Sequence, residues 1–149
     1  MCKPIPKPKK KKKSETVKGW EEKVWKVFSE YIRLKYATNS GYVKCCTCDK
    51  VLFWKGEGMQ AGHYIPGRRP PYLFEENCVH PQCAHCNKWE QGNQVQYKKF
   101  MIKKYGEMEE ERVYNLKYIT GVGFTIDELK CLLAKYKQKV KDLSHKTSQ

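Results

Sequence analysis

Between residues 59 and 93 the chain concentrates side chains that bind metal ions or transfer protons. This segment, MQAGHYIPGRRPPYLFEENCVHPQCAHCNKWEQGN, contains three histidines, three cysteines and three asparagines. Thiolates are common ligands of structural zinc, and a neutral imidazole can accept a proton from water. The segment therefore indicates a metal site with residues capable of general-base chemistry beside it.

Two pairs of cysteines have the spacing of zinc knuckles. CCTC supplies Cys45 and Cys48, and CAHC supplies Cys83 and Cys86. Two intervening residues let both thiolates of a tight turn reach one ion at about 2.3 Å. Cys46 is an alternative to Cys45, although the C-x-C that it would form with Cys48 fits a knuckle less well. We predict one structural zinc held by four cysteines.

Length and charge limit the class of protein. The chain has 149 residues, enough for one domain with a modest core. Its net charge is +14, and seven lysines lie within the first 13 residues. Such a surplus favours a polyanionic partner, most often nucleic acid, although a solubilising tail or attraction to anionic lipid would also explain it. No membrane span or signal peptide is recognised, so we expect a soluble, cytoplasmic protein. Disulfides belong mainly to secreted proteins, so we expect the remaining cysteines, Cys2, Cys78 and Cys131, to be ordinary free thiols.

The elements that must position these residues follow from the sequence pattern. Apolar residues recur at three- and four-residue intervals across residues 19–37, which predicts an amphipathic helix. YVKC and KVLFW predict two short strands around the first knuckle, MQAGHYI predicts a third, and NCVHPQC is short and extended because Pro81 disfavours helix. NKWEQ begins a helix that Gly92 interrupts and Gly106 ends. TIDE at 125–128 is a capping box for a last helix.

These elements predict an α+β fold with a small zinc-stabilised core. The single domain covers residues 16–143, with its ββα core at about 42–106 and C-terminal helices at about 107–141. Residues 1–15 are a disordered Lys/Pro-rich arm and residues 144–149 a tail. The tryptophans are expected in or against the core rather than as base-stacking platforms: Trp20, Trp25, Trp54 and Trp89.

The order of strand, histidine, loop, asparagine, knuckle and helix resembles the ββα-metal nucleases of the HNH superfamily. That resemblance implies that His63 is the general base, Asn77 the middle asparagine, and Asn87 the ligand of a catalytic Mg or Mn ion. The CN dipeptide beside four zinc cysteines is similar to endonuclease VII-type resolvases, which cut branched DNA. HNH enzymes often carry an aspartate ligand immediately before the base, where this chain has Gly62. His80 is a further candidate for the catalytic site.

Longer phrases resemble a phage family across about residues 20–135. FSEYIRLKYA, GYVKCCTCDKVLFWKGEGMQAGHYIPGR, LFEENCVHPQCAHCN, GNQVQYKKFMIKKYG and FTIDEL are similar to the NinG (Rap) recombination proteins of lambdoid and related phages. The resemblance implies a structure-specific, metal-dependent DNA endonuclease that cuts Holliday junctions and D-loops in a bacterial host. Many relatives begin with an additional cysteine motif, whereas this chain begins with lysines.

Basic residues complete the predicted DNA site. Arg68 and Arg69 closely follow the base histidine and could grip phosphate through their guanidinium forks, or could be plain surface charge. The arm adds Lys9, Lys10, Lys11, Lys12 and Lys13. Two alternatives to the nuclease remain: a non-catalytic zinc-dependent DNA-binding accessory protein, and an accessory protein that recruits other recombination proteins through the arm. We expect a homodimer, because junction resolution usually needs two active sites.

Overall fold

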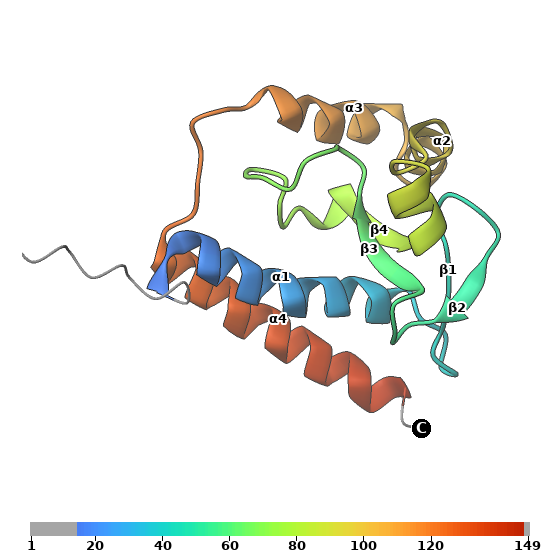
Figure 1. Ribbon diagram of the computed structural model, residues 1–149, viewed down its shortest axis with the longest axis horizontal. Helices are drawn as coiled ribbons and strands as arrows, with labels where there is room; N and C mark the ends of the chain where they lie inside the picture. Colours follow the sequence, from blue (N-terminus) through green and yellow to red (C-terminus); the bar gives the residue numbers. More distant parts are fainter. Residues whose placement is uncertain (1–14, 148–149) are drawn as a thin grey trace, which may run out of the picture.

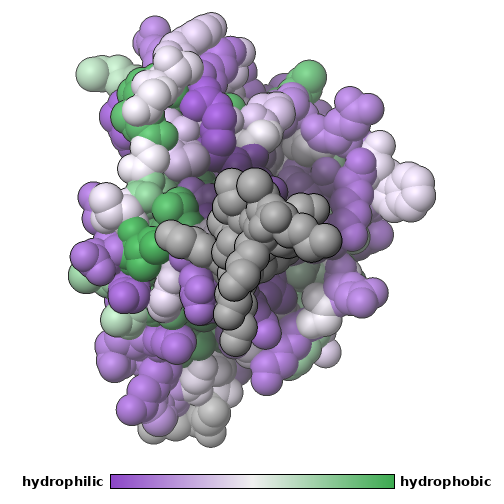
Figure 2. Space-filling view, turned by 60° about the vertical axis from the view of Figure 1, so that its left-hand side comes forward, coloured by the Kyte–Doolittle hydropathy of each residue, from purple (hydrophilic) through white to green (hydrophobic). Residues whose placement is uncertain are grey.

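The computed structural model describes residues 15–147 and has an α+β fold (Figure 1). The predicted arm lies outside these residues except for its last position. Two long helices, α1 (Val17–Lys35) and α4 (Ile126–Thr147), lie side by side and run in the same direction. No helix within residues 15–147 is long and apolar enough to cross a membrane. Hydrophilic side chains cover most of the face shown in Figure 2, with smaller apolar groups between them.

Within residues 15–147 four short strands form two antiparallel pairs, and the strands fall on the segments that the sequence predicts to be strands or extended. The first pair joins β1 (Tyr42–Lys44) to β2 (Val51–Phe53), and the second joins β3 (Met59–His63) to β4 (Val79–Cys83). In the second pair Gly62 lies opposite His80. This β3–β4 pair lies between the α1–α4 layer and the helices α2 (Gln94–Tyr105) and α3 (Glu107–Asn115) (Figure 1).

The segment after β4 is helical but interrupted, as predicted. A π-helical turn, η3 (His85–Trp89), directly follows the end of β4, and α2 begins only after a break at Gly92, where φ is 89°. Gly106, with φ of 86°, then ends α2. Both glycines adopt a left-handed conformation that costs other residues energy, which explains why the helix stops at these two points.

The larger core joins the α1–α4 contact to residues 64–79 and to α2 and α3. Val24, Phe28 and Ile32 of α1 are fully buried, and the ring of Phe28 meets Tyr136 of α4 edge-on at 4.8 Å between centroids. The predicted capping box is present at the start of α4, where the backbone N–H of Thr125 donates to Glu128 at 2.7 Å. Reciprocal capping of this kind satisfies donors that the first helical turn leaves unpaired.

The predicted tail at 144–149 is wrong in its first part, because α4 continues to Thr147. Leu143, close to this end of α4, packs against two groups of buried residues, one that includes Phe28 and one that includes Cys83. The end of α4 therefore buries apolar surface. Short 3-10 turns lie at η2 (Glu76–Cys78), before β4, and at η4 (Leu116–Tyr118), after α3.

An ionic cluster ties η2 to the two long helices. The carboxylate of Glu76 accepts hydrogen bonds from Tyr31 at 2.9 Å, from Tyr136 at 3.1 Å and from Lys139 at 2.7 Å. Lys35 adds a fourth contact at 3.2 Å. These donors come from α1 and α4, so the loop that leads into β4 is fixed to the helical layer.

Candidate functional site

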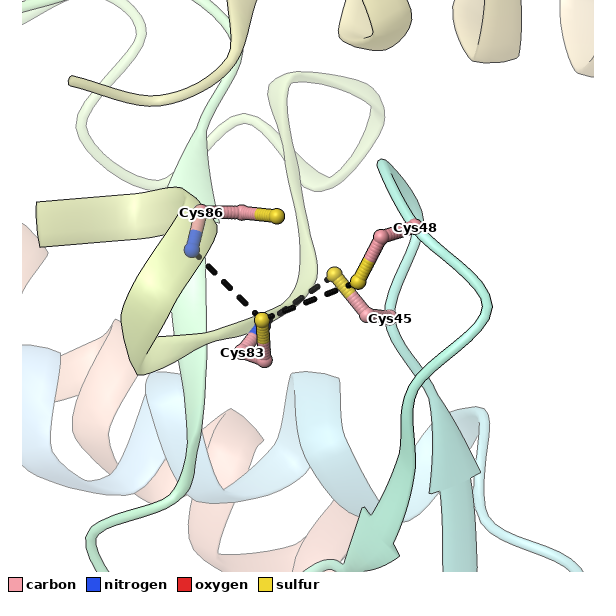
Figure 3. Close-up of side chains that lie close together, drawn as sticks. All are labelled: Cys45, Cys48, Cys83 and Cys86. Carbon is pink, nitrogen blue, oxygen red and sulfur yellow. Dashed lines mark hydrogen bonds between the residues drawn. The ribbon is translucent and has the colours of Figure 1, made fainter. Parts of the chain in front are cut away.

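Four cysteine side chains converge between the two strand pairs (Figure 3). Cys45 and Cys48 come from the loop between β1 and β2, Cys83 ends β4, and Cys86 lies on η3. Their sulfur atoms all lie within 4.8 Å of one another, and the sulfurs of Cys48 and Cys83 are 3.8 Å apart. A tetrahedral ion with bonds of about 2.3 Å requires sulfurs roughly 3.8 Å apart. The cluster could therefore hold a structural metal such as zinc.

The structure distinguishes Cys45 from Cys46. Cys46 is not among the four cysteines whose sulfur atoms lie within 4.8 Å of one another, and its thiol interacts with the Tyr97 side chain instead. Cys45 is therefore the cluster's member, as predicted from the knuckle spacing. Cys78 is buried and Cys131 exposed, and both are free.

A pocket of about 760 Å³ brings several of the predicted catalytic residues together. His63 lines it from the end of β3, Arg68 from the following loop, and Asn87 from η3, directly after the metal-cluster residue Cys86. Helix α1 contributes Trp25 to the same wall. The second cysteine pair thus positions Asn87 in the pocket, and the β3–β4 pair positions His63.

His63 has the state that a general base needs. Its ring is 9% exposed and stacks on the Trp25 indole at 4.9 Å between centroids. Burial, with a smaller contribution from the charge of Arg68, lowers the pKa of His63 to about 4, although the bond to the Leu73 carbonyl opposes the change. The imidazole is therefore neutral at physiological pH.

The hydrogen bond to Leu73 also selects the tautomer of His63. Nε2 lies 3.1 Å from the Leu73 carbonyl oxygen, and because a carbonyl can only accept, Nε2 must carry the proton. The lone pair of the neutral ring is then on Nδ1. Within residues 15–147 no hydrogen bond occupies Nδ1. This atom could accept a proton.

Asn87 is held in one orientation. Its side-chain nitrogen donates to Gln60 at 2.8 Å, which leaves Oδ1 as the available acceptor. Amide oxygens are among the hard ligands that Mg²⁺ and Mn²⁺ accept. Asn87 could therefore contribute one protein ligand to a divalent ion at the pocket wall.

The pocket wall is basic on balance. Arg33, Arg68 and Lys88 line it, against the single carboxylate of Glu57. The guanidinium of Arg68 lies 4.1 Å from the centroid of the Trp25 ring, a cation–π contact that limits its motion. A wall with this charge suits a phosphate group.

His80 does not join this site, contrary to the sequence expectation. It is fully buried, its Nδ1 lies 3.0 Å from the hydroxyl of Tyr97, and its Nε2 lies 2.7 Å from the hydroxyl of Tyr105. Burial lowers the pKa of His80 to about 3, and nearby lysines add to the effect. With both nitrogens engaged in the core, His80 is a packing residue in this structure.

Asn77 and Arg69 also lie away from the pocket wall. The Asn77 amide donates to Glu109 of α3 at 2.8 Å, so it joins η2 to that helix. The Arg69 guanidinium donates to the backbone carbonyls of Pro70, Ile119 and Lys117. Arg69 therefore holds the segment after α3 in place, and the predicted phosphate contact is not supported. The predicted contacts of Lys9 to Lys13 lie outside the described residues.

One tryptophan near the pocket differs from the sequence expectation. Trp25 packs against the core, as expected, and it also lines the pocket and contacts His63. Trp89 is likewise expected to pack against the core, yet it is 81% exposed, and its chain neighbours Lys88 and Gln91 line the pocket. The polar neighbours of Trp89 in NKWEQGN are the signal in the sequence, because they leave it no apolar face to join.

Comparison with known proteins places the chain in a phage family. A family profile described as "NinG: Bacteriophage Lambda NinG protein" matches residues 5–146. Proteins named "Protein ninG" from Escherichia phage lambda and Escherichia phage 933W are 34% and 33% identical over 90 residues, and that from Salmonella phage P22 is 34% identical over 95 residues. Each match covers 60% of this chain but only 43%, 44% and 43% of those relatives, respectively.

No solved structure matches the chain. The family profile covers nearly the whole sequence, including both cysteine pairs and every residue of the pocket. The chain belongs to the NinG family of phage proteins.

Proposed function

We propose that this protein is a metal-dependent, structure-specific DNA endonuclease of phage recombination that cuts branched DNA, such as Holliday junctions, inside the bacterial host. The observation that carries the proposal is the presence of neutral, buried His63 and of Asn87 in one basic pocket beside the cysteine cluster. The order of β3, β4 and η3 agrees with the HNH and endonuclease VII resemblance of the sequence. Two copies acting together would be needed to cut both strands of a junction.

The chemistry follows from the positions of the side chains. Nδ1 of His63 takes a proton from a water molecule as that water attacks phosphorus. Arg68 and Lys88 hold the phosphate against the wall that they line. Asn87 would hold a Mg or Mn ion through Oδ1, and such an ion, when bound, supplies positive charge for the developing charge on phosphate and leaving oxygen. One amide ligand suits magnesium, which commonly keeps several waters.

The decisive experiment compares cleavage of a four-way junction and of a linear duplex with the same sequence, in Mg²⁺ or Mn²⁺ and in EDTA. His63→Ala should reduce the cleavage rate by about 100- to 10,000-fold, because a general base is removed. Zinc content, folding and junction binding should stay unchanged. His85→Ala is the matched control, because His85 is exposed and, within the described residues, its side chain pairs with Glu90 at 3.1 Å rather than with a pocket residue.

Asn87→Ala should be comparably severe, but raised Mn²⁺ should restore part of its activity. His63→Ala should show no such rescue, since added metal does not replace a proton acceptor. Junction cleavage by His63→Ala at the parental rate would remove the proposed role of this pocket.

A second candidate, a non-catalytic DNA-binding accessory protein, is favoured by one separate feature. A groove of about 660 Å³ runs beside the first knuckle and is lined by Lys44, Lys99, Lys103 and Lys104. Lysines grouped in this way suit the phosphates of a DNA backbone. Tight junction binding by zinc-loaded protein that never cuts, with either metal, would favour this candidate over the nuclease.

A further inference from the structure

Among the buried side-chain nitrogen and oxygen atoms of residues 15–147, one has no hydrogen-bond partner: the side-chain oxygen of Gln82. Gln82 is fully buried on β4, and its Nε2 donates to the Thr47 hydroxyl at 3.0 Å and to the Gly92 carbonyl at 2.7 Å. Because the Gly92 carbonyl can only accept, the amide cannot be turned around. Its oxygen must therefore face the other way, and an acceptor left unsatisfied there is unfavourable.

The Gln82 oxygen faces the backbone of Gly62 and the side chain of Asn87. A Cβ placed on Gly62 would lie 2.3 Å from Gln82 Oε1 and 3.1 Å from Asn87 Oδ1. Two amide oxygens therefore approach one point beside Gly62 from two different elements, β4 and η3. Any side chain at residue 62 would displace the Gln82 oxygen, which explains why this position is glycine.

The two oxygens share a second property: within residues 15–147 neither accepts a hydrogen bond. The Asn87 nitrogen is already used by Gln60, so Asn87 cannot donate to Gln82. Two carbonyl-type oxygens at one point, one of them cut off from solvent, produce a negative potential that a hard cation would satisfy. Asn87 lines the pocket that also contains His63, so this point lies beside the wall of that pocket.

We propose that Gln82 Oε1 and Asn87 Oδ1 bind one divalent cation together, so that Gln82 supplies an oxygen ligand from β4 that residue 62 cannot supply. The proposal rests on the proposed nuclease function and deepens it by naming a second protein ligand for the metal. Neutral amide ligands give a site that binds Mg²⁺ or Mn²⁺ weakly and leaves several coordination positions to water and phosphate. Gly62 directly precedes His63, so β3 carries both the residue beside the proposed ion and the proposed base.

The test is Mn²⁺ binding to the full-length, zinc-loaded protein, measured by electron paramagnetic resonance without DNA. Gln82→Ala should weaken Mn²⁺ binding at least tenfold, whereas Gln96→Ala, which changes a glutamine of the other groove, should leave it unchanged. Gly62→Ala should weaken it similarly, because the added Cβ pushes the Gln82 oxygen away while the amide stays. Zinc content and thermal unfolding of each variant show that the effect is local.

A double variant makes the test independent of any defect in Gln82→Ala alone. Gly62→Asp combined with Gln82→Ala removes the 2.3 Å clash with Gln82 Oε1, leaves the new Cβ 3.1 Å from the Cβ of residue 82, and adds a carboxylate beside Asn87. Mn²⁺ should then bind at least as tightly as in the parent protein. Unchanged Mn²⁺ binding by folded Gln82→Ala would overturn the proposal and indicate that only a buried water satisfies the oxygen. Mn²⁺ binding that depends on Gln82, in a protein that cuts no DNA, would instead uphold this site and refute the nuclease function.

Discussion

The low pKa of His63 has a direct consequence for the pH dependence of cleavage. The main cause of the low pKa is burial, and the Trp25 indole covers one face of the imidazole. Trp25→Ala would open that face to water from the pocket. The pKa of His63 should then rise from about 4 toward its ordinary value of 6.5.

The size of the effect follows from the fraction of neutral imidazole. At a pH of about 5.5, a group with a pKa of 4 is roughly 97% neutral, whereas one with a pKa of 6.5 is roughly 9% neutral. Full relief of burial would therefore reduce the cleavage rate about tenfold at that pH. The reduction should shrink as pH rises and vanish above about pH 7.5, because both proteins are then neutral at His63.

The assay is single-turnover cleavage of a saturating four-way junction across the acid range, with direct titration of the His63 ring by NMR. Trp20→Ala is the matched control, because Trp20 lies on the same helix but contacts Lys23 and Lys130 rather than the pocket. In the parent protein the cleavage rate should fall on the acid side near pH 4, and in Trp25→Ala this fall should occur at a higher pH. An acid limb near 6.5 in the parent protein would refute the assignment of buried His63 as the base.

Three further results are expected. Burial opposes ionisation of Glu76, but hydrogen bonds from Lys139, Tyr31 and Lys35 outweigh it and hold its pKa at about 2 instead of 4.5. The stabilisation from these bonds is therefore present above pH 4.5 and lost as pH falls toward 2. Glu76→Gln should lower the free energy of unfolding in urea by about 1–2 kcal/mol at neutral pH, after allowance for solvent screening. Deleting residues 1–13, with their seven lysines, should flatten the log–log salt dependence of duplex binding by roughly 0.9 for each phosphate that the arm no longer neutralises, and an unchanged slope would exclude contact between the arm and DNA. Trp89→Ala should weaken binding to DNA with unpaired bases by about 1–3 kcal/mol per stacked base and leave duplex binding unchanged, whereas the equally exposed control Met108→Ala should change neither.

The local parts of this molecule were predictable from sequence. Each knuckle lies within four residues, so spacing alone identified the cysteines that converge, and Asn87 followed from its position directly after Cys86. The strand pairs, the break at Gly92 and the capping box at Thr125 also depend on near neighbours. In each case the residues that determine the structure lie within one turn or one short strand pair.

The errors concern contacts between residues far apart in the chain. Arg69 resembles a phosphate ligand in sequence because it follows His63 closely, but its partners are the carbonyls of Lys117 and Ile119, almost 50 residues later. His80 lies within the motif, which makes it a candidate for the site by position, but its side chain meets Tyr97 and Tyr105 of α2. Pattern and spacing carry no information about which distant residue saturates a polar group, so these assignments required the fold.

The cysteine cluster and the pocket share η3, and this connection leads to a last prediction. Cys86 and Asn87 are consecutive, and the backbone N–H of Cys86 lies 3.5 Å from the sulfur of Cys83. Metal bound to the cluster therefore fixes the turn that carries Asn87. The buried residues around the cluster, including Val43, Trp54 and Met59, form a separate group from the core between α1 and α4.

Cys83→Ser should consequently remove the metal and unfold the region around the cluster while leaving much of the α1–α4 pair helical, because structural zinc sites contribute folding free energy of order 10 kcal/mol. Elemental analysis should show that zinc is absent, circular dichroism should retain much of the helical signal, and cleavage should stop without rescue by Mg²⁺ or Mn²⁺. Cys131→Ser is the control, because its exposed thiol lies outside the cluster. EDTA at low concentration should give the opposite behaviour in the parent protein, a loss of cleavage that added Mg²⁺ reverses, since a weakly held catalytic ion leaves before a four-thiolate zinc does. Persistent cleavage by zinc-free Cys83→Ser would show that Asn87 is positioned without the cluster, and the division between a structural and a catalytic metal would then be wrong.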